Sequence, residues 1–239
     1  MRKQKKEDYW VSISDMMTGL MIIFMFIAIA YILEVKKEQK ERDALFEDFQ
    51  ITKERLFNDL DSVFSDDFKR WDVELDRDLS IKFTNPEILF GANSSALTSK
   101  FSAILKSFIP KYLDILLKEE YSDKISEVRI EGHTNTKPTR QYKDSYMGNL
   151  ILSQQRSAEV LEYLRNTDYF KELSPEKEAK LQFWLTANGL SFGRTLDKDK
   201  KLTLISKQPA DNTLSRRVEF KIVTTSSELV ESVIKNLEK

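Results

Sequence analysis

Residues 125–135 read ISEVRIEGHTN, an alternation of apolar and polar side chains that runs into a glycine. Such alternation predicts a β-strand with one buried face, and the glycine predicts a turn directly after the strand. The next periodic stretch, residues 149–166, spaces its apolar residues like an amphipathic helix. A strand followed by a helix is the unit from which mixed α/β layers are built.

The same alternation of element types extends outward on both sides of this unit. Further strands are predicted at residues 79–83, 183–189 and 216–223, and further helices at residues 95–118 and 226–239. Strands that alternate with helices predict an α/β sandwich in which the helices cover one face of a sheet.

Three motifs in the C-terminal part of the chain are similar to those of OmpA-like peptidoglycan-binding domains. They are IEGHTN at 130–135, NLILSQQRSAEVLEYL at 149–164 and LSRRVEF at 214–220. They resemble, in order, the family's GHTD turn, its N-x-x-L-S-x-x-R-A helix start and its N-R-R-V-E strand. The resemblance implies an OmpA-like domain over residues 76–225 that binds the peptide stems of the bacterial cell wall.

The resemblance also implies which residues hold the stem peptide. Arg156 would take a stem carboxylate, with Thr134, Asn135 and Asn149 completing the pocket and Arg217 supporting it from the last strand. A fixed guanidinium suits this role because its N–H groups match the geometry of a carboxylate.

One position departs from the family pattern within the pocket. Asn135 stands where the family usually has aspartate, and an amide cannot form an ion pair with a ligand ammonium group. The loss of one such charge at a partly exposed site costs about 1 kcal/mol. Ser215, in place of the amide that usually precedes the two arginines, is a milder change.

No catalytic, metal or nucleic-acid chemistry is indicated by the sequence. His133 is the only histidine and has no companion for a zinc site or a catalytic triad within its motif, so we expect it to be structural. The 38 basic and 39 acidic residues nearly cancel, which argues against nucleic acid as a partner. We therefore expect a non-enzymatic protein without a cofactor.

Residues 16–33, MMTGLMIIFMFIAIAYIL, are free of charge. At 1.5 Å per residue the run covers roughly 27 Å, close to the thickness of the bilayer core. No small-residue cleavage site follows it, so we predict a retained membrane helix over residues 10–33 rather than a signal peptide. Basic residues flank it almost equally, but a wall-binding domain must face the wall. We therefore expect a single-pass inner-membrane protein with a cytoplasmic tail at residues 1–9 and a periplasmic C-terminal domain.

Residues 34–75 are dense in charge and lack glycine and proline. Their apolar positions recur at spacings of three, four and seven, which predicts a helical linker. These positions include Leu45, Phe46, Phe49, Leu56, Leu60 and Val63. The spacing fits a solvated spacer and a dimerising coiled coil equally well.

Asp15 is an acid at the start of the apolar run, and Thr18 and Gly19 share its helical face. A boundary or N-cap role is the simple alternative. However, the order of tail, Asp-bearing helix, spacer and OmpA-like domain resembles the MotB branch of ion-driven motors. That resemblance implies that Asp15 and Thr18 serve the transport of H⁺ or Na⁺. It also implies a homodimer and a MotA-like, multi-helix membrane partner.

Within that branch, SISDMMTGLMIIFMFIAIAY at residues 12–31 looks closer to the ZorB type of the Zorya anti-phage systems than to flagellar MotB. This closer resemblance implies ZorA as the partner and defence as the role. A flagellar-type stator and a passive wall anchor are the alternatives. In a passive anchor Asp15 would be incidental.

Overall fold

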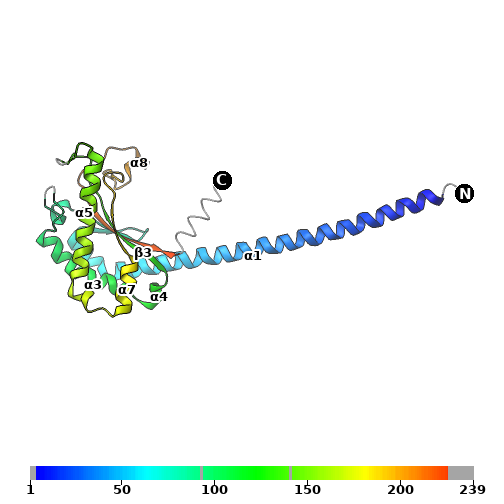
Figure 1. Cartoon of the computed structure of the whole chain (residues 1–239), viewed down its shortest axis with the longest axis horizontal. Helices are drawn as coiled ribbons and strands as arrows, with labels where there is room; N and C mark the ends of the chain where they lie inside the picture. Colours follow the sequence, from blue (N-terminus) through cyan, green and yellow to red (C-terminus); the bar gives the residue numbers. More distant parts are fainter. Residues whose placement is uncertain (1–3, 92–93, 140–141, 226–239) are drawn as a thin grey trace. The chain divides into compact units, whose positions relative to one another are not determined.

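The computed structural model describes residues 4–91, 94–139 and 142–225 of the 239-residue chain (Figure 1). The chain divides into two compact units, Met1–Asp48 and Phe49–Lys239. The helix predicted at residues 226–239 lies outside the described residues.

Helix α1 runs without interruption from Gln4 to Trp71. The predicted membrane helix and the predicted helical linker are therefore parts of one helix. The linker prediction extended to residue 75, but the helix ends at Trp71 and Val73–Leu75 form strand β1 instead. In the first unit α1 contains a segment that is long and apolar enough to cross a membrane, and none of that segment is buried. An exposed apolar surface of this size marks a membrane or partner interface.

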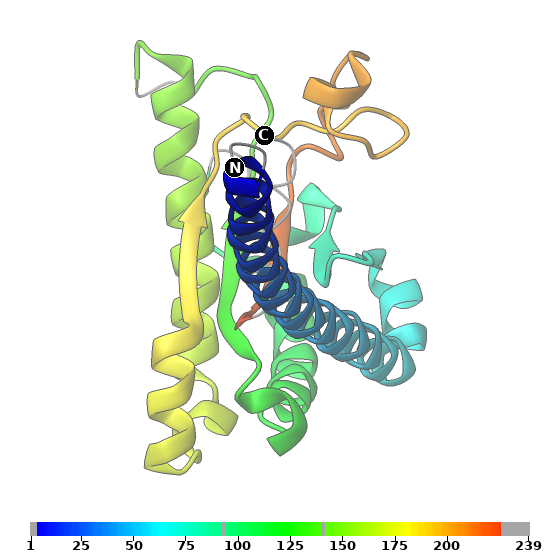
Figure 2. The ribbon, with the colours of Figure 1, turned by 90° about the vertical axis from the view of Figure 1, so that its right-hand side faces the viewer.

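The second unit contains a five-stranded sheet in the order β1-β2-β5-β3-β4. The strands are β1 (Val73–Leu75), β2 (Ser80–Phe83), β3 (Ile125–Gly132), β4 (Leu185–Gly189) and β5 (Val218–Thr224). Only β3 and β4 pair in parallel, and they lie side by side in green and yellow in Figure 2. The four predicted strands are confirmed within two residues at each end, and β1 was not predicted.

Seven helices of the described residues accompany the sheet. They are α2 (Pro86–Leu89), α3 (Ser99–Leu116), α4 (Glu119–Ser122), α5 (Ser145–Asn166), α6 (Asp168–Lys171), α7 (Pro175–Trp184) and α8 (Thr203–Ser206). Helix α5 begins before the predicted residue 149 because the Asp144 carboxylate caps it, accepting from the backbone N–H groups of Tyr146 and Met147. The sequence pattern does not predict α7, and it assigns residues 183–184, the last two of this helix, to a strand.

Helices α3 and α5 lie on the same face of the sheet, as predicted (Figure 1). Between α3 and the sheet, Phe101 packs on Phe83 with ring centroids 5.5 Å apart, and Phe108 packs on Phe220 at 5.1 Å. Such aromatic pairs contribute about 1 kcal/mol each beyond the area they bury.

The last turns of α1 belong to this same core. Leu56, Leu60 and Phe64 are fully buried, and the Phe64 ring lies 5.2 Å from that of Phe108. The apolar spacing of this part of the linker therefore reflects packing on the chain's own domain. Neither the solvated spacer nor the dimerising coiled coil accounts for that packing. The compact unit that contains the sheet accordingly begins at Phe49.

Two glycines let α5 lie close to the ends of the parallel strands. A Cβ at Gly132 would stand 2.2 Å from the Ser153 carbonyl oxygen, and one at Gly189 would stand 2.4 Å from the Gln154 nitrogen. Both contacts are with backbone atoms, which cannot move aside cheaply. This close approach places the first turns of α5 beside the loop that follows β3.

Candidate functional site

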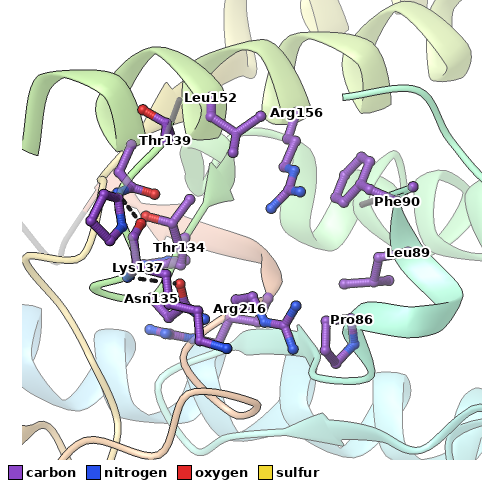
Figure 3. A pocket seen from close by; sticks show the side chains of 15 residues that line it. Pro86, Leu89, Phe90, Thr134, Asn135, Lys137, Thr139, Leu152, Arg156 and Arg216 are labelled. Carbon is purple, nitrogen blue, oxygen red and sulfur yellow. Dashed lines mark hydrogen bonds between the residues drawn. The ribbon is translucent and has the colours of Figure 1, made fainter. Parts of the chain in front are cut away.

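A cavity of about 110 Å³ opens at this end of the sheet (Figure 3). Its walls come from α2 and the residues after it, the loop at residues 133–139, the first turns of α5 and the residues just before β5. All five residues predicted to bind the stem peptide line this cavity: Thr134, Asn135, Asn149, Arg156 and Arg217.

Thr134 and Asn135 lie in the buried loop after β3. The Thr134 N–H donates to the Ser191 carbonyl at 2.9 Å, which ties the loop to the segment after β4. The Asn135 side-chain oxygen accepts from the Lys137 N–H at 3.2 Å, and its amide nitrogen donates to the Asn212 carbonyl at 3.4 Å. The Thr134 hydroxyl, in contrast, has no hydrogen-bond partner among the described residues.

Asn149 positions the loop at residues 133–139. It is 2% exposed, and its amide nitrogen donates to the Lys137 carbonyl at 2.9 Å and to the Ser145 carbonyl at 3.0 Å. Both amide hydrogens are thus used within the protein, so Asn149 shapes the cavity wall by holding the loop against α5.

Arg156 is the most unusual charged residue of the cavity. It is only 9% exposed, and no carboxylate of the described residues forms an ion pair with it. Its Nε donates to the Ser94 carbonyl at 3.0 Å, and its guanidinium lies 4.9 Å from the centre of the Phe90 ring. Burial, and next the charge of Arg216, lowers the pKa of Arg156 to about 10, so it is still a cation at neutral pH.

The two arginines before β5 have different surroundings. Arg217 is buried, and it donates to the Glu219 carboxylate and, at 3.1 Å, to the Arg194 carbonyl. Arg216 is half-buried, its Nε donates to the Asn212 carbonyl at 3.2 Å, and its guanidinium lies across the cavity from Arg156 (Figure 3).

Arg216 is one of the lining residues that the sequence motifs did not identify, although the strand pattern carried a signal. Side chains alternate between the two faces of a strand. Val218 and Phe220 face the helices, so a residue at an even position just before them, such as Arg216, lies on the helix side. Arg217 and Glu219 fall on the other face.

A buried charge cluster lies on that other face. Glu131, His133 and Glu219 place one ligand atom each within 4.8 Å of one another, a spacing at which they could hold a metal ion. However, the carboxylates already have cationic partners, since Arg217 contacts Glu219 and Arg194 lies 3.3 Å from Glu131. The two arginines neutralise the two acids, which leaves no excess charge for a metal to compensate.

His133 sits between these carboxylates without a well-formed hydrogen bond. Its Nε2 lies 3.5 Å from a Glu131 oxygen and 3.7 Å from a Glu219 oxygen. Burial lowers the pKa of His133, and the nearby carboxylates only partly oppose this. The pKa of Glu131 is lowered as well, because His133 and Arg194 outweigh the cost of burying its charge. This arrangement fits the structural role predicted for His133.

In the first unit, Asp15 lies well inside α1, which begins at Gln4. It therefore cannot cap the helix N-terminus. Its side chain is exposed and has no ion-pair or hydrogen-bond partner among the residues that the structure describes. The Thr18 hydroxyl donates to the Ser14 carbonyl at 2.8 Å, and nothing lies within 4 Å of the Cβ position at Gly19. Asp15, Thr18 and Gly19 thus form an open face on the helix.

Comparisons with known proteins agree with the fold and the motifs. The model of the OmpA family matches residues 89–201, which confirms the predicted OmpA-like domain. The Zorya protein ZorB of Escherichia coli strain Crooks is 36% identical over 98% of this chain and 95% of its own length. A second Zorya protein ZorB, from another Escherichia coli strain, is 26% identical over 92% of this chain and 81% of its own.

Solved structures share only a distant likeness with the chain. A putative MotB-like protein from Desulfovibrio vulgaris has a TM-score of 0.48 at 18% identity and covers 73% of this chain and 96% of its own. The periplasmic domain of Helicobacter pylori MotB has a TM-score of 0.41 at 17% identity, and the match covers 66% of this chain and 84% of the MotB chain.

Proposed function

The chain belongs to the ZorB family, and we propose that it is the peptidoglycan-anchored B subunit of an ion-driven membrane motor. Two charged side chains support the two halves of this proposal. Among the described residues, Arg156 has no carboxylate partner and Asp15 has no cationic partner. Arg156 serves the anchor and Asp15 serves the ion path.

The anchoring half rests on one observation, the buried Arg156 without a carboxylate. Burying an unpaired cation costs several kcal/mol unless a partner compensates for it. A wall stem peptide carries carboxylates of the right charge, and the cavity is open to receive one. A carboxylate bound there would pair with the Arg156 guanidinium, which otherwise contacts the Ser94 carbonyl and the Phe90 ring.

The membrane part of the proposal rests on the apolar segment of α1. A domain that grips the wall works in the periplasm, so the helix crosses the inner membrane with its N-terminus in the cytoplasm. This orientation puts Asp15 near the cytoplasmic end of the span.

In that position Asp15 can alternate between a neutral and a charged form as a proton binds and leaves, with Thr18 beside it on the same face. One elementary charge that crosses 100 mV releases about 2.3 kcal/mol, enough to bias a conformational step in surrounding helices. A single helix cannot enclose an ion path, so a second copy of this chain and a multi-helix MotA-like subunit, ZorA, complete it. The wall-bound domain is the fixed point against which the partner moves, and the assembly acts in anti-phage defence.

The experiment is a plaque assay on cells that carry the complete system with single substitutions in this chain. Asp15→Asn removes the charge and keeps the size, so protection should fall to the level of cells without the system. Asp43→Asn makes the same change at an exposed position of α1 outside the apolar run, and should leave protection unchanged. Membrane levels and partner co-purification should be the same for both variants.

Full protection by Asp15→Asn would defeat the motor reading. A passive wall anchor predicts that result, together with loss of protection when Arg156 is replaced. The assay therefore separates the two functions.

A further inference from the structure

The charged groups of the cavity are all of one sign. Three arginines and Lys137 line it beside the neutral His133, and no aspartate or glutamate of the described residues does. In the part of the chain that the structure describes, only Arg217 among the lining arginines has a carboxylate partner, and that carboxylate lies on the opposite face of the sheet. The cavity is therefore an uncompensated cationic site.

Arg156 and Arg216 supply this charge from opposite walls (Figure 3). Each donates from Nε to one backbone carbonyl, of Ser94 and Asn212 respectively, which fixes the stem of the guanidinium and leaves its outer N–H groups available. Two cations that share a desolvated cavity repel one another, and an anion between them reverses that cost. Two guanidiniums on facing walls suit two carboxylates better than one.

The described lining of the cavity offers no anion to a ligand ammonium group. Asn135 carries no charge, and its side-chain oxygen already accepts from the Lys137 N–H. A ligand ammonium entering the cavity would meet two guanidiniums and no anion. The free Thr134 hydroxyl, which is buried in the wall, offers a neutral hydrogen bond in its place.

Resting on the proposed wall-binding function, we propose that this cavity selects ammonium-free dicarboxylate ends of stem peptides, with Arg156 and Arg216 each binding one carboxylate. In a stem of this kind the side amine of the diamino acid is acylated, as in a cross-link, and so is uncharged. The chain thereby grips joined stems in preference to stems with a free amine. Arg216 is the specificity residue of this site, since it provides the second positive charge.

The test compares two small probes with the same carbon skeleton, pimelate and meso-diaminopimelate. Pimelate has both carboxylates and no amine, whereas diaminopimelate adds two ammonium groups. Binding to the full chain in detergent is measured by calorimetry or NMR titration. We expect pimelate to bind about 10-fold more tightly, and Asn135→Asp to narrow or reverse this preference by adding an anion for the ammonium. Tighter binding of diaminopimelate by the unmodified chain, or an unchanged ratio in Asn135→Asp, would overturn the proposal.

A second variant tests the role of Arg216. Arg216→Gln should weaken pimelate binding about 5-fold and should weaken the binding of butyrate, a monocarboxylate, clearly less. The control Lys171→Gln removes one positive charge on α6, at the other end of α5, and should affect neither probe. Equal loss for pimelate and butyrate in Arg216→Gln would count against a two-carboxylate site.

Sedimentation of the same preparations with purified wall sacculi keeps this inference separate from the proposed function. If the unmodified chain sediments with sacculi but binds diaminopimelate more tightly than pimelate, the dicarboxylate selection alone is overturned. Failure of the unmodified chain to sediment would overturn the wall-binding function itself.

Discussion

Arg156 and Arg217 both lie at the wall of one cavity and both are buried, yet they differ in what neutralises their charge. Arg217 contacts the Glu219 carboxylate and the Arg194 carbonyl, so its charge is satisfied within the fold. Among the described residues, Arg156 contacts the Ser94 carbonyl and the Phe90 ring and has no carboxylate partner. A buried ion pair belongs to the fold, whereas a buried cation without an anion is arranged for a ligand. Side-chain burial alone would not have distinguished the two.

The largest effect that this comparison predicts is on stability. Arg217→Met should lower the free energy of unfolding by about 3–5 kcal/mol, because Glu219 is then left buried without its partner. The same substitution at Arg156 removes one hydrogen bond, but it also removes a buried cation that has no carboxylate partner among the described residues, so it should not lower the free energy of unfolding by more than about 1 kcal/mol. Urea unfolding of the full chain in detergent, followed by circular dichroism, measures both.

A double substitution sharpens this contrast. Arg217→Met combined with Glu219→Gln should recover part of the stability lost in Arg217→Met, since no unpaired charge is left behind. Equal destabilisation by Arg156→Met and Arg217→Met would contradict the distinction between them.

The charge cluster around Arg217 also predicts a pH dependence that the cavity side does not share. The pKa of His133 in the folded chain lies below its ordinary value of 6.5, so the unfolded chain takes up the proton first on acidification. The stability contributed by neutral His133 is therefore present above about pH 6.5 and is lost as the pH falls below that value. Glu131, with an ordinary pKa of 4.5 that is also lowered, adds a further loss only in a more acidic range.

Melting temperatures between pH 7.5 and 5.5 isolate the histidine. The unmodified chain should become less stable across this range, and His133→Gln should be nearly insensitive to it. A variant that loses stability as steeply as the unmodified chain would mean that another group is responsible.

The smallest expected effect on stability is that of Thr134→Val. The Thr134 hydroxyl is buried and has no hydrogen-bond partner within the described ranges. Its replacement by a methyl group should therefore change the free energy of unfolding by less than about 1 kcal/mol, with a gain as the expected sign. Binding to sacculi should nevertheless weaken several-fold, because the ligand loses a hydrogen bond. A clear loss of stability in this variant would indicate that the hydroxyl serves the fold rather than the ligand.

Local patterns in the sequence predicted the elements whose own residues determine them. Strand β3 was placed at its observed bounds, Ile125–Gly132, because its alternation is regular and ends at a glycine. Strand β1 was missed because Val73–Leu75 is short and follows a long helical pattern. The strand exists only because β2 lies beside it.

Partners that lie far apart along the chain explain the remaining differences. Leu56, Leu60 and Phe64 have the spacing of an amphipathic helix, but their spacing cannot tell whether a second chain or the chain's own α3 covers them. The resemblance named Arg217, which lines the cavity, and did not name the neighbouring Arg216. Counting the alternation back from Val218 and Phe220 would have added Arg216 to the predicted pocket residues.

The most direct test of the account is the sedimentation of the full chain with purified sacculi after Arg156→Gln, compared with the unmodified chain and with Lys171→Gln. We predict that Arg156→Gln remains in the supernatant with an unchanged melting temperature, while the other two proteins sediment. Sedimentation of Arg156→Gln to the same extent as the unmodified chain would contradict the claim that this unpaired arginine holds the wall.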